Sequence, residues 1–504
     1  MTTTERGGPA PAPAAEPPQY DGARMDGADS GTRGRTPVIV VAAAILAVGL
    51  ATFLFPSSAT YDAWSWIVWG REIVHGELNT ISGPSWKPLP VLVTTIAAPL
   101  GSIAPDVWVL AARLGAITAI VLAFSLARRL GGTAAGLLAA VGLGAAPWWI
   151  WNGWLANSEG VLVAVVLGAI LAELDGRRRL AFACAVAAGL LRPEAWPFVL
   201  LYAAWLAWQG GLRERLVVGA GLVILPLAWL LPEKWGSGDY WRAASRAQNP
   251  DPGAASLTDF PAWTVTKDFF TMLPTATWGF VAAAVVAGLV LLVAYRRNGS
   301  FPAAMAPPGT PRRAWPTIVA IAVFGAAWLA VVVVLTTRGF SGNERYLIPP
   351  VALVLVAASA GFGRLLMRIP LPVGSALIAV LGVALAVSAI DDVPRQLRSA
   401  TYESRLIDDL PKTIAAAGGA ERINRCADVS THKFMVPQAA WYLRRHLEDV
   451  SMVPSGPTQV VLRLRLQQNG GWTPTVSHIP GLETWTATPY WTIVARCEIS
   501  ESAR

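Results

Sequence analysis

Several charged residues of this chain lie at the ends of long apolar segments. Asp62 follows the first membrane-length apolar run, and Lys87 stands directly before Pro88. Arg192 and Glu194 interrupt a later apolar stretch. Because polar groups at membrane depth are costly, they usually mark a functional site. A carboxylate beside several cations suits the transfer of a group to or from an anionic substrate.

Asp62 has two interpretations on sequence alone. Aspartate favours helix N-termini, so Asp62 could cap a helix over residues 63–75. Alternatively it is a general base whose pKa is raised by burial among Trp64, Trp66 and Trp69. The same tryptophan-rich stretch is typical of an interfacial helix, with its rings at the level of the lipid headgroups.

Basic residues supply the complementary charge. The candidate phosphate ligands are Lys87, Arg192, Arg338 and Arg345. A lysine fixed by a following proline is a point cation suited to phosphate. Arg192 has an alternative role, because an ion pair with Glu194 or Glu159 would only close the helix bundle. Cations that converge on one cavity favour an anionic substrate such as a lipid phosphate.

Composition places the chain in the membrane class. Of its 504 residues, 54% are hydrophobic and 14% are charged, and the mean hydropathy is +0.46. Soluble domains have roughly a quarter of their residues charged. The net charge of +8 does not indicate nucleic-acid binding, because the basic residues fall in short clusters between apolar runs. That distribution is typical of cytoplasmic loops under the positive-inside rule.

The apolar runs predict an all-α polytopic membrane protein. Residues 1–36 are expected to form a disordered cytoplasmic tail and residues 37–390 the transmembrane domain. Residues 88–104 are interrupted by prolines, which predicts an interfacial or re-entrant segment. About eleven transmembrane helices are predicted, at 37–55, 106–128, 132–150, 160–174, 180–192, 195–209, 216–232, 273–295, 315–336, 347–366 and 371–390.

The basic clusters orient these helices in the plasma membrane. The N-terminus is expected in the cytoplasm and the C-terminus outside. Almost every unusual polar residue then falls on the outer face, in loops 56–105, 151–159, 192–194, 233–272 and 337–346. The sequence therefore predicts a chemically rich outer face.

Residues 391–504 are different in kind. Alternating apolar and polar residues predict strands at Gln459–Leu466 and Trp491–Ile499, within a small extracytoplasmic α/β domain. Cys426 and Cys497 both lie in this segment, whereas the third cysteine lies in an apolar run. Outside the membrane the two would form a disulfide, and two reduced core cysteines are the alternative.

This pattern resembles the GT-C membrane glycosyltransferases over about residues 37–390. The resemblance rests on an acid in the first outer loop, an interfacial helix, the step Trp86-Lys87-Pro88-Leu89 and the turn Arg192-Pro193-Glu194. Within that superfamily the chain is similar to the protein-mannosyltransferase and aminoarabinose-transferase branch, and to actinobacterial mannosyl- and arabinosyltransferases of cell-wall biogenesis.

The resemblance implies a GT-C-like bundle and transfer of a sugar from a polyprenyl phosphate at the outer membrane face. It implies Asp62 as catalytic base, Glu159 as a second outer-loop acid, and Lys87 near the donor phosphate. Many members carry two adjacent acids in the first loop, whereas Asp62 is followed by Ala63. No metal ligand is therefore assigned, and a divalent cation is left open as the only cofactor.

Such chemistry needs a base for the acceptor and cations for the phosphate, and the sequence has no nucleotide-phosphate loop motif. Inversion by single displacement is expected, because no second carboxylate is evident as a nucleophile. Candidate contacts for the acceptor or sugar are Trp64, Trp154, Tyr240, Trp241 and Arg242. Anchoring at the membrane interface is the alternative role for the tryptophan rings.

A polytopic transporter or lipid flippase is the competing hypothesis. It would place polar residues near the membrane midplane and show internal repeats. Residues 37–209 are not repeated in 216–390, and the polar residues lie at the outer ends of the helices. The expected partners are thus a polyprenyl-phosphate sugar, a cell-envelope glycan, lipid or protein as acceptor, and the bilayer, with no nucleic acid.

Overall fold

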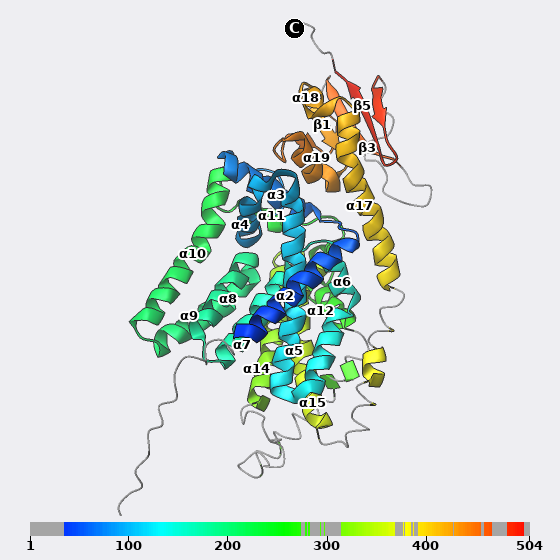
Figure 1. The fold of residues 1–504 in the computed structure, drawn as a ribbon. Helices are drawn as coiled ribbons and strands as arrows, with labels where there is room; N and C mark the ends of the chain where they lie inside the picture. Colours follow the sequence, from blue (N-terminus) through cyan, green and yellow to red (C-terminus); the bar gives the residue numbers. More distant parts are fainter. Residues whose placement is uncertain are drawn as a thin grey trace, which may run out of the picture. The chain divides into compact units, whose positions relative to one another are not determined.

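The computed structural model describes residues 35–273, 314–367, 392–426, 428–454, 458–465 and 481–497, and scattered positions within 278–297 and 376–387. The chain divides into two compact units, Met1–Leu46 and Ala47–Arg504. Helix α2 (Arg35–Ala51) begins in the first unit and is followed by the short helix η1 (Thr52–Leu54). Helix η1 and all later described elements belong to the second unit. Figure 1 shows these elements along the chain.

The chain is a multi-pass membrane protein. Among the described residues, four helical stretches are long and apolar enough to cross a membrane: Pro88–Gly144, Leu212–Ser237, Ala314–Thr337 and Glu344–Leu366. A fifth would be formed by α6 (Pro147–Trp154) and α7 (Glu159–Leu174), which meet at an angle of 116°.

Six of the predicted spans are helices in the described part of the chain, with bounds close to those expected, although only those at 216–232, 315–336 and 347–366 are long and apolar enough to cross a membrane alone. The matching helices are α7, α8 (Arg178–Leu191), α9 (Trp196–Gln209), α10 (Leu212–Ser237), α14 (Ala314–Thr337) and α15 (Ile348–Leu366). The spans predicted at 273–295 and 371–390 lie almost entirely outside the described residues. The predicted total of about eleven therefore stays a prediction, as do the domain boundary near residue 390 and the sides of the membrane.

Two of the predicted spans are successive helical segments on either side of a kink. Helix α5 (Ala104–Gly144) covers the segments predicted at 106–128 and 132–150, with a break where Gly132 adopts a φ of 84°. The second of these predicted spans ends too late, because α6 begins at Pro147. Proline is favoured at the first helical position, where its missing N–H has no partner to lose.

Prolines at the start of a helix also occur in the segment of residues 88–104. Pro88 and Pro90 occupy the first turn of α4 (Pro88–Ala97), so the segment is helical, and η2 (Ala98–Ile103) joins it to α5. Helix α4 packs against α3 (Tyr61–His75) and α5.

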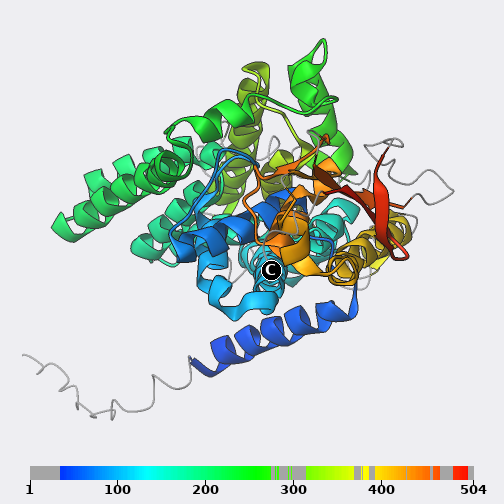
Figure 2. The same cartoon turned by 90° about the horizontal axis from the view of Figure 1, so that it is seen from above.

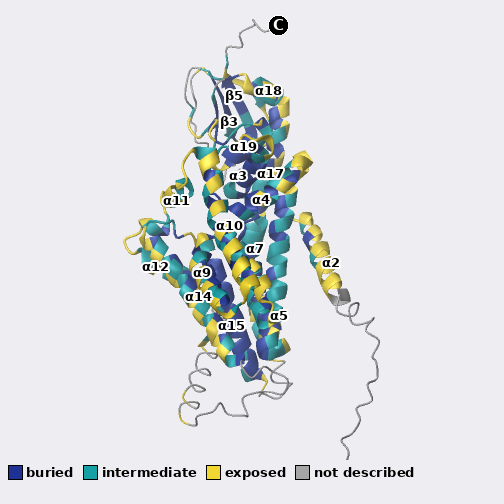
Figure 3. Ribbon diagram, turned by 90° about the vertical axis from the view of Figure 1, so that its left-hand side faces the viewer, coloured by how far each residue is buried: buried dark blue, intermediate teal, exposed yellow. Residues whose placement is uncertain are grey.

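Helix α15 forms the centre of the bundle and is buried along nearly its whole length (Figure 3). It packs on α5 and α14, and α5 packs in turn on α7. Small residues allow these close approaches: a Cβ added to Gly131 would lie 2.3 Å from the carbonyl oxygen of Ala360. Packing through small residues is the usual way in which membrane helices associate closely.

The tryptophans of α3 are part of the protein core. Trp66 and Trp69 have no exposed surface, and Trp64 is 4% exposed. Trp66 packs edge-on against Trp108 at 5.2 Å between ring centroids, and Trp69 lies 5.5 Å from Trp86. These rings therefore face protein and not lipid, because α4 and α19 (Val436–Leu443) pack on the helix, and their level in the membrane stays a prediction.

The C-terminal segment forms an α/β structure, as predicted. Its sheet has the order β2-β1-β3-β5-β4, with β1 parallel to β2 and β3 and with β5 antiparallel to β3 and β4. Helix α17 packs against β4 and β5 (Figure 2). The elements are α17 (Asp392–Ala416), α18 (Gly419–Asn424), β1 (Asp428–Thr431), η7 (Lys433–Met435), α19, β2 (Val450–Ser451), β3 (Gln459–Leu464), β4 (Glu483–Ala487) and β5 (Trp491–Arg496).

Both predicted strands are present, as β3 and β5, and each ends two or three residues earlier than expected. The other three strands were not predicted: β1 has four residues and β2 two, and β4 contains no buried residue. A disulfide joins Cys426, just before β1, to Cys497, just after β5.

Candidate active site

A cavity of about 750 Å³ gathers residues from segments far apart in the sequence. Its lining comes from the start of α3, the end of the loop before α4, the turn between α8 and α9, the segment that follows α10, and the loop before α15. Apart from Trp196, Trp229 and Leu230, every lining residue belongs to a loop predicted for the outer face. The short helices of these loops are η3 (Pro193–Ala195), α11 (Arg242–Ala247), η4 (Ala255–Leu257), α12 (Pro261–Met272) and η6 (Glu344–Leu347).

Asp62 lines this cavity from the first turn of α3. The N-cap of the helix is Thr60, and no side chain caps it. The Oδ2 atom of Asp62 instead accepts a hydrogen bond from Nη2 of Arg345 at 2.6 Å. The interpretation of Asp62 as a helix cap is therefore wrong, because its side chain is directed to a partner across the cavity.

The surroundings of Asp62 keep its carboxyl group ionised. Burial acts to raise the pKa of Asp62, but the positive charges of Arg345 and Lys87 outweigh it and hold the pKa below its usual value. The predicted rise in this pKa is wrong for the protein without a ligand. Sequence showed the burial of the aspartate but gave no sign of its arginine partner.

Arg192 lies in the break between α8 and α9, where Pro193 begins the next helical turn. Its guanidinium forms an ion pair with Glu159 at the start of α7, and its Nη1 atom is 3.8 Å from Oε1 of Glu194. Its Cζ atom lies 4.2 Å from the ring centroid of Tyr346. Both ion pairs considered from the sequence are present, so Arg192 does help to close the bundle.

These ion pairs leave hydrogen-bonding capacity unused. Within the part of the chain that the structure describes, four buried atoms here have no hydrogen-bond partner: Nε of Arg192, Nε of Arg345, Oε2 of Glu159 and Oε2 of Glu194. A buried polar atom without a partner is costly, so such atoms suit a ligand that would bond to them. Two of the four are cationic donors on residues that line the cavity.

Lys87 is 6% exposed and directly precedes α4. Its Nζ atom donates to Oγ of Ser158 at 3.3 Å and lies 4.9 Å from the ring centroid of Trp66. Burial lowers the pKa of Lys87 to about 7, and the positive charge of Arg192 acts in the same direction. Lys87 is therefore a cation poorly compensated by its surroundings.

Of the remaining candidate residues, only two line the cavity. Tyr240 and Trp241 line the cavity and are largely exposed. The others lie outside its lining: Glu159 behind Arg192, Trp64 against Tyr442, Trp154 at the end of α6, Arg338 just after α14, and Arg242 against the loop before α4.

Sequence reasoning did not select several residues that line the cavity. They include Arg246, Asp251, Asp268, Trp196 and Trp229. Arg246 and Asp251 carry a signal, because both are charged residues in a predicted outer loop. Trp196 and Trp229 lie in apolar segments and carry none.

The two acids proposed from the resemblance do not fit a divalent cation. Asp62 and Glu159 each form an ion pair with an arginine. Among the described residues, no group of three or more histidine, cysteine, aspartate or glutamate side chains could hold a metal ion.

Comparison with known proteins gives a structural likeness only. No protein-family model and no curated protein matches the chain. Its structure resembles ArnT from Cupriavidus metallidurans bound to undecaprenyl phosphate, with a TM-score of 0.51 and 13% identity. The apo state of the same protein gives a TM-score of 0.50 and 15% identity, and each match covers 92% of this chain and 98% of the other.

An oligosaccharyltransferase from Archaeoglobus fulgidus, in complex with zinc and sulfate, gives a TM-score of 0.41 and 12% identity over 81% of this chain and 61% of that one. The likeness to ArnT, a GT-C aminoarabinose transferase, extends over nearly the whole of both chains. The protein therefore has the fold of the GT-C membrane glycosyltransferases, as its sequence pattern implied.

Proposed function

We propose that this protein is a glycosyltransferase that moves a sugar from a polyprenyl-phosphate donor to a cell-envelope glycan, lipid or protein. The observation that carries the proposal is one cavity lined by Lys87, Arg192 and Arg345 together with Asp62, whose carboxylate is paired with Arg345. The ArnT structure of the same fold is bound to undecaprenyl phosphate. The cavity would open on the outer face of the plasma membrane.

The three cations would bind the donor phosphate. Lys87 offers a point charge, while Arg192 and Arg345 each have an Nε–H that finds no partner among the residues that the structure describes. Hydrogen bonds between guanidinium and phosphate are strong because both groups are charged. The same donors would stabilise the negative charge that grows on the phosphate as the sugar leaves, which is the main requirement of this chemistry.

Asp62 would act as the general base. In the free protein, Arg345 holds this carboxylate in its ionised form. A phosphate that shares the charge of Arg345 would weaken that hold, and the pKa of Asp62 would rise toward the working pH. Donor binding would thereby activate the base.

The reaction would be a single displacement with inversion. The acceptor hydroxyl oxygen attacks the anomeric carbon, its proton passes to Asp62, and the bond to the phosphate oxygen breaks with both electrons on that oxygen. The products are the glycosylated acceptor and the polyprenyl phosphate. Tyr240 and Trp241, exposed on the cavity wall, are the proposed contacts for the sugar or acceptor.

The direct test uses purified full-length protein in lipid nanodiscs. It is incubated with radiolabelled polyprenyl-phosphate mannose, arabinose or aminoarabinose and with a cell-envelope extract as acceptor. We expect labelled acceptor from one of these donors, and loss of label with Asp62→Asn. Asp175→Asn is the matched control, because Asp175 is an exposed aspartate paired with Arg129, away from the cavity. Absence of transfer from every polyprenyl-phosphate sugar would contradict the proposal, and lipid translocation without transfer would favour a flippase.

A further inference from the structure

We propose that Glu233 and Arg242 form a positioning pair that holds Lys87 in the phosphate-binding part of the cavity. The pair would act through the segment of residues 76–87 between α3 and α4, called here the Lys87 loop. This inference rests on the proposed function, since Lys87 is taken to bind the donor phosphate. Neither Glu233 nor Arg242 is among the residues that line the cavity.

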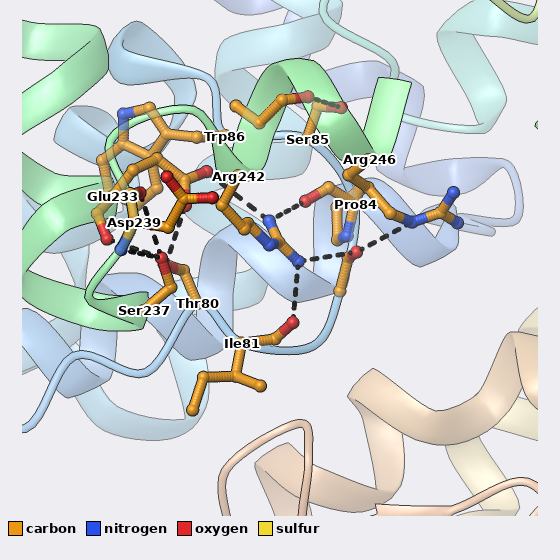
Figure 4. A network of polar contacts seen from close by, with 12 residues as sticks. Thr80, Ile81, Pro84, Ser85, Trp86, Glu233, Ser237, Asp239, Arg242 and Arg246 are labelled. Atoms are coloured by element: carbon orange, nitrogen blue, oxygen red, sulfur yellow. Dashed lines mark hydrogen bonds and ion pairs between the residues drawn. The ribbon is translucent and has the colours of Figure 1, made fainter. Parts of the chain in front are cut away.

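Arg242 binds the backbone of the Lys87 loop with both arms of its guanidinium (Figure 4). Its Nη1 atom donates to the carbonyl oxygen of Pro84 at 2.6 Å, and its Nη2 atom donates to that of Gly83 at 2.9 Å. A weaker contact of 3.5 Å reaches the carbonyl of Ile81. The planar guanidinium has several donors in a fixed geometry, which a lysine cannot reproduce.

Glu233 anchors this arginine from the end of α10. Its side chain has no exposed surface, and Oε1 lies 3.5 Å from Nη1 of Arg242. Its Oε2 atom accepts a hydrogen bond from Oγ1 of Thr80 at 3.0 Å, so the same carboxylate also holds the Lys87 loop. A buried charge at the end of a membrane helix is costly unless it is paired and serves a purpose.

The attachment continues along the loop to the residue before Lys87. The Thr80 N–H donates to the carbonyl of Gly236 at 3.1 Å. Ser85 Oγ donates to the carbonyl of Ala243 at 3.0 Å, and Trp86 Nε1 donates to that of Ala228 at 3.0 Å. The loop is thus fixed to α10 and α11 from Thr80 to Trp86, and the position of Lys87 follows from the position of Trp86.

The Glu233–Arg242 pair also connects the Lys87 loop to α11, and both of these segments line the cavity. Arg242 begins α11, of which Ala243, Ala244, Arg246 and Ala247 line the cavity. Arg246 Nε donates to the carbonyl of Gly83 at 3.3 Å, beside the contact from Arg242. A shift of the Arg242 side chain would therefore move Lys87 relative to the wall that faces it. Displacements of about 1 Å at such a site can lower rates by about 10²-fold.

The test compares Arg242→Ala, Arg242→Lys and Glu233→Gln with the intact protein, in transfer assays and in direct binding of a sugar-free polyprenyl phosphate. We expect Arg242→Ala to raise the donor KM and to lower kcat/KM by about 10²-fold. Arg242→Lys should restore only part of this loss, because one ammonium cannot bind two carbonyls at once. Glu233→Gln keeps the shape and the acceptor for Thr80, so it tests the charge alone and should give a smaller increase in donor KM.

A double variant separates positioning from general stability. If Arg242 acts through Lys87, then Arg242→Ala should cause little further loss of donor binding when Lys87→Ala is already present. Losses that multiply would contradict the proposal, and so would normal donor binding by Arg242→Ala. Arg179→Ala is the matched control. It breaks a 2.7 Å ion pair with Glu214, which lies at the start of α10, whereas Glu233 lies at the end of that helix. This control should leave donor KM unchanged.

The two proposals fail in distinguishable ways. If the intact protein binds polyprenyl phosphate but transfers no sugar, the proposed reaction is wrong, and the binding assays still test the pair. If the protein transfers sugar and Arg242→Ala leaves donor KM and binding unchanged, only the positioning role is wrong. If the intact protein does neither, both proposals are wrong. Should Arg242→Ala fail to fold, Glu233→Gln and Arg242→Lys decide the question.

Discussion

Asp62 and Arg345 lie 283 residues apart in the sequence and form a charged hydrogen bond of 2.6 Å. The contact joins the first turn of α3 to the segment that leads into α15. It also joins the two functions that the cavity would need, a base for the acceptor and a cation for the phosphate. A ligand that binds Arg345 must therefore change the protonation behaviour of Asp62.

Asp62→Asn should lower turnover by about 10²–10⁴-fold, because the amide cannot take a proton from the acceptor. Asparagine has nearly the same size and still accepts a hydrogen bond from Arg345, so folding should change little. The donor KM should not rise, since Arg345 loses a competitor for the phosphate. The measurement is steady-state transfer at varied donor concentration, with Asp175→Asn as control. Full activity of the variant would exclude Asp62 as the base and leave Glu159 as the next candidate.

Lys87 should make the transfer reaction less efficient at alkaline pH, which is called here its alkaline limit. Burial lowers its pKa to about 7 in the free protein. Since only the protonated amine attracts the donor phosphate, kcat/KM for the donor should fall as the pH rises through about 7. Lys87→Ala should weaken donor binding at every pH.

Lys87→Arg provides the matched control for this pH dependence. Arginine stays protonated at all accessible pH values, so its alkaline limit should move upward or disappear. The measurement is a pH profile of kcat/KM between pH 5 and pH 9. An alkaline limit that stays at the same pH in Lys87→Arg would show that another group causes it.

The predictable residues of the site are charged residues next to long apolar runs. Asp62, Lys87 and Arg192 are charges beside apolar runs, where each is costly without a function or a partner. The partners of Arg192 were among those considered from the sequence, but the partner of Asp62 was not predictable, because Arg345 reaches Asp62 only through the tertiary fold. The same limit explains Arg242, which is an outer-loop arginine like Arg345 but binds backbone carbonyls outside the cavity.

The tryptophans show a second limit of sequence reasoning. Trp64, Trp66 and Trp69 lie beside a membrane-length segment, and headgroup-level anchors have that same pattern. What distinguishes core from interface is coverage by α4 and α19. Helix α19 is more than 350 residues away in the chain, so local periodicity could not reveal it. The apolar membrane helices were predictable, because length and hydropathy are local properties.

Glu72 should make the stability of the protein depend on pH. It lies in α3 without exposed surface, accepts from Asn79 N–H at 2.9 Å, and lies 2.9 Å from Nδ1 of His446 in the C-terminal segment. Burial raises the pKa of Glu72 from 4.5 to about 7. The proton is thus bound more tightly in the folded state than in the unfolded state.

The sign of this dependence follows from the raised pKa. The stabilisation is fully present below pH 4.5 and is lost as the pH rises through about 7. Its size is up to about 3 kcal/mol, at about 1.4 kcal/mol per pKa unit. Glu72→Gln should remove this component, whereas Glu448→Gln should retain it, because Glu448 is exposed and accepts from the side-chain amide of Asn79 nearby. Thermal unfolding between pH 4.5 and pH 8 measures it, and identical curves for Glu72→Gln and the intact protein would contradict it.

The Cys426–Cys497 disulfide should stabilise the C-terminal α/β segment. It links residues 71 positions apart, from just before β1 to just after β5. Closing a loop of this length typically contributes about 2–4 kcal/mol, because it restricts the unfolded chain. Reduction, or Cys426→Ser together with Cys497→Ser, should lower the thermal stability of this segment. Mass mapping without reductant should find the linked peptides, and free thiols at both positions would contradict the prediction.

The last prediction concerns the sides of the membrane, on which the proposed reaction depends. Arginine-rich turns between apolar helices favour the cytoplasm, so Arg178 should be cytoplasmic, while Glu344 and Arg504 should be outside. Arg178 begins α8, and Glu344 lines the cavity near the opposite end of the membrane helices. Single cysteines at these three positions, in a variant without the native cysteines, can be labelled in intact cells with a membrane-impermeant thiol reagent. Labelling at 344 and 504 but not at 178 is expected. Labelling at 178 alone would put the cavity on the cytoplasmic side, where a donor displayed on the outer leaflet could not reach Lys87 and Arg345.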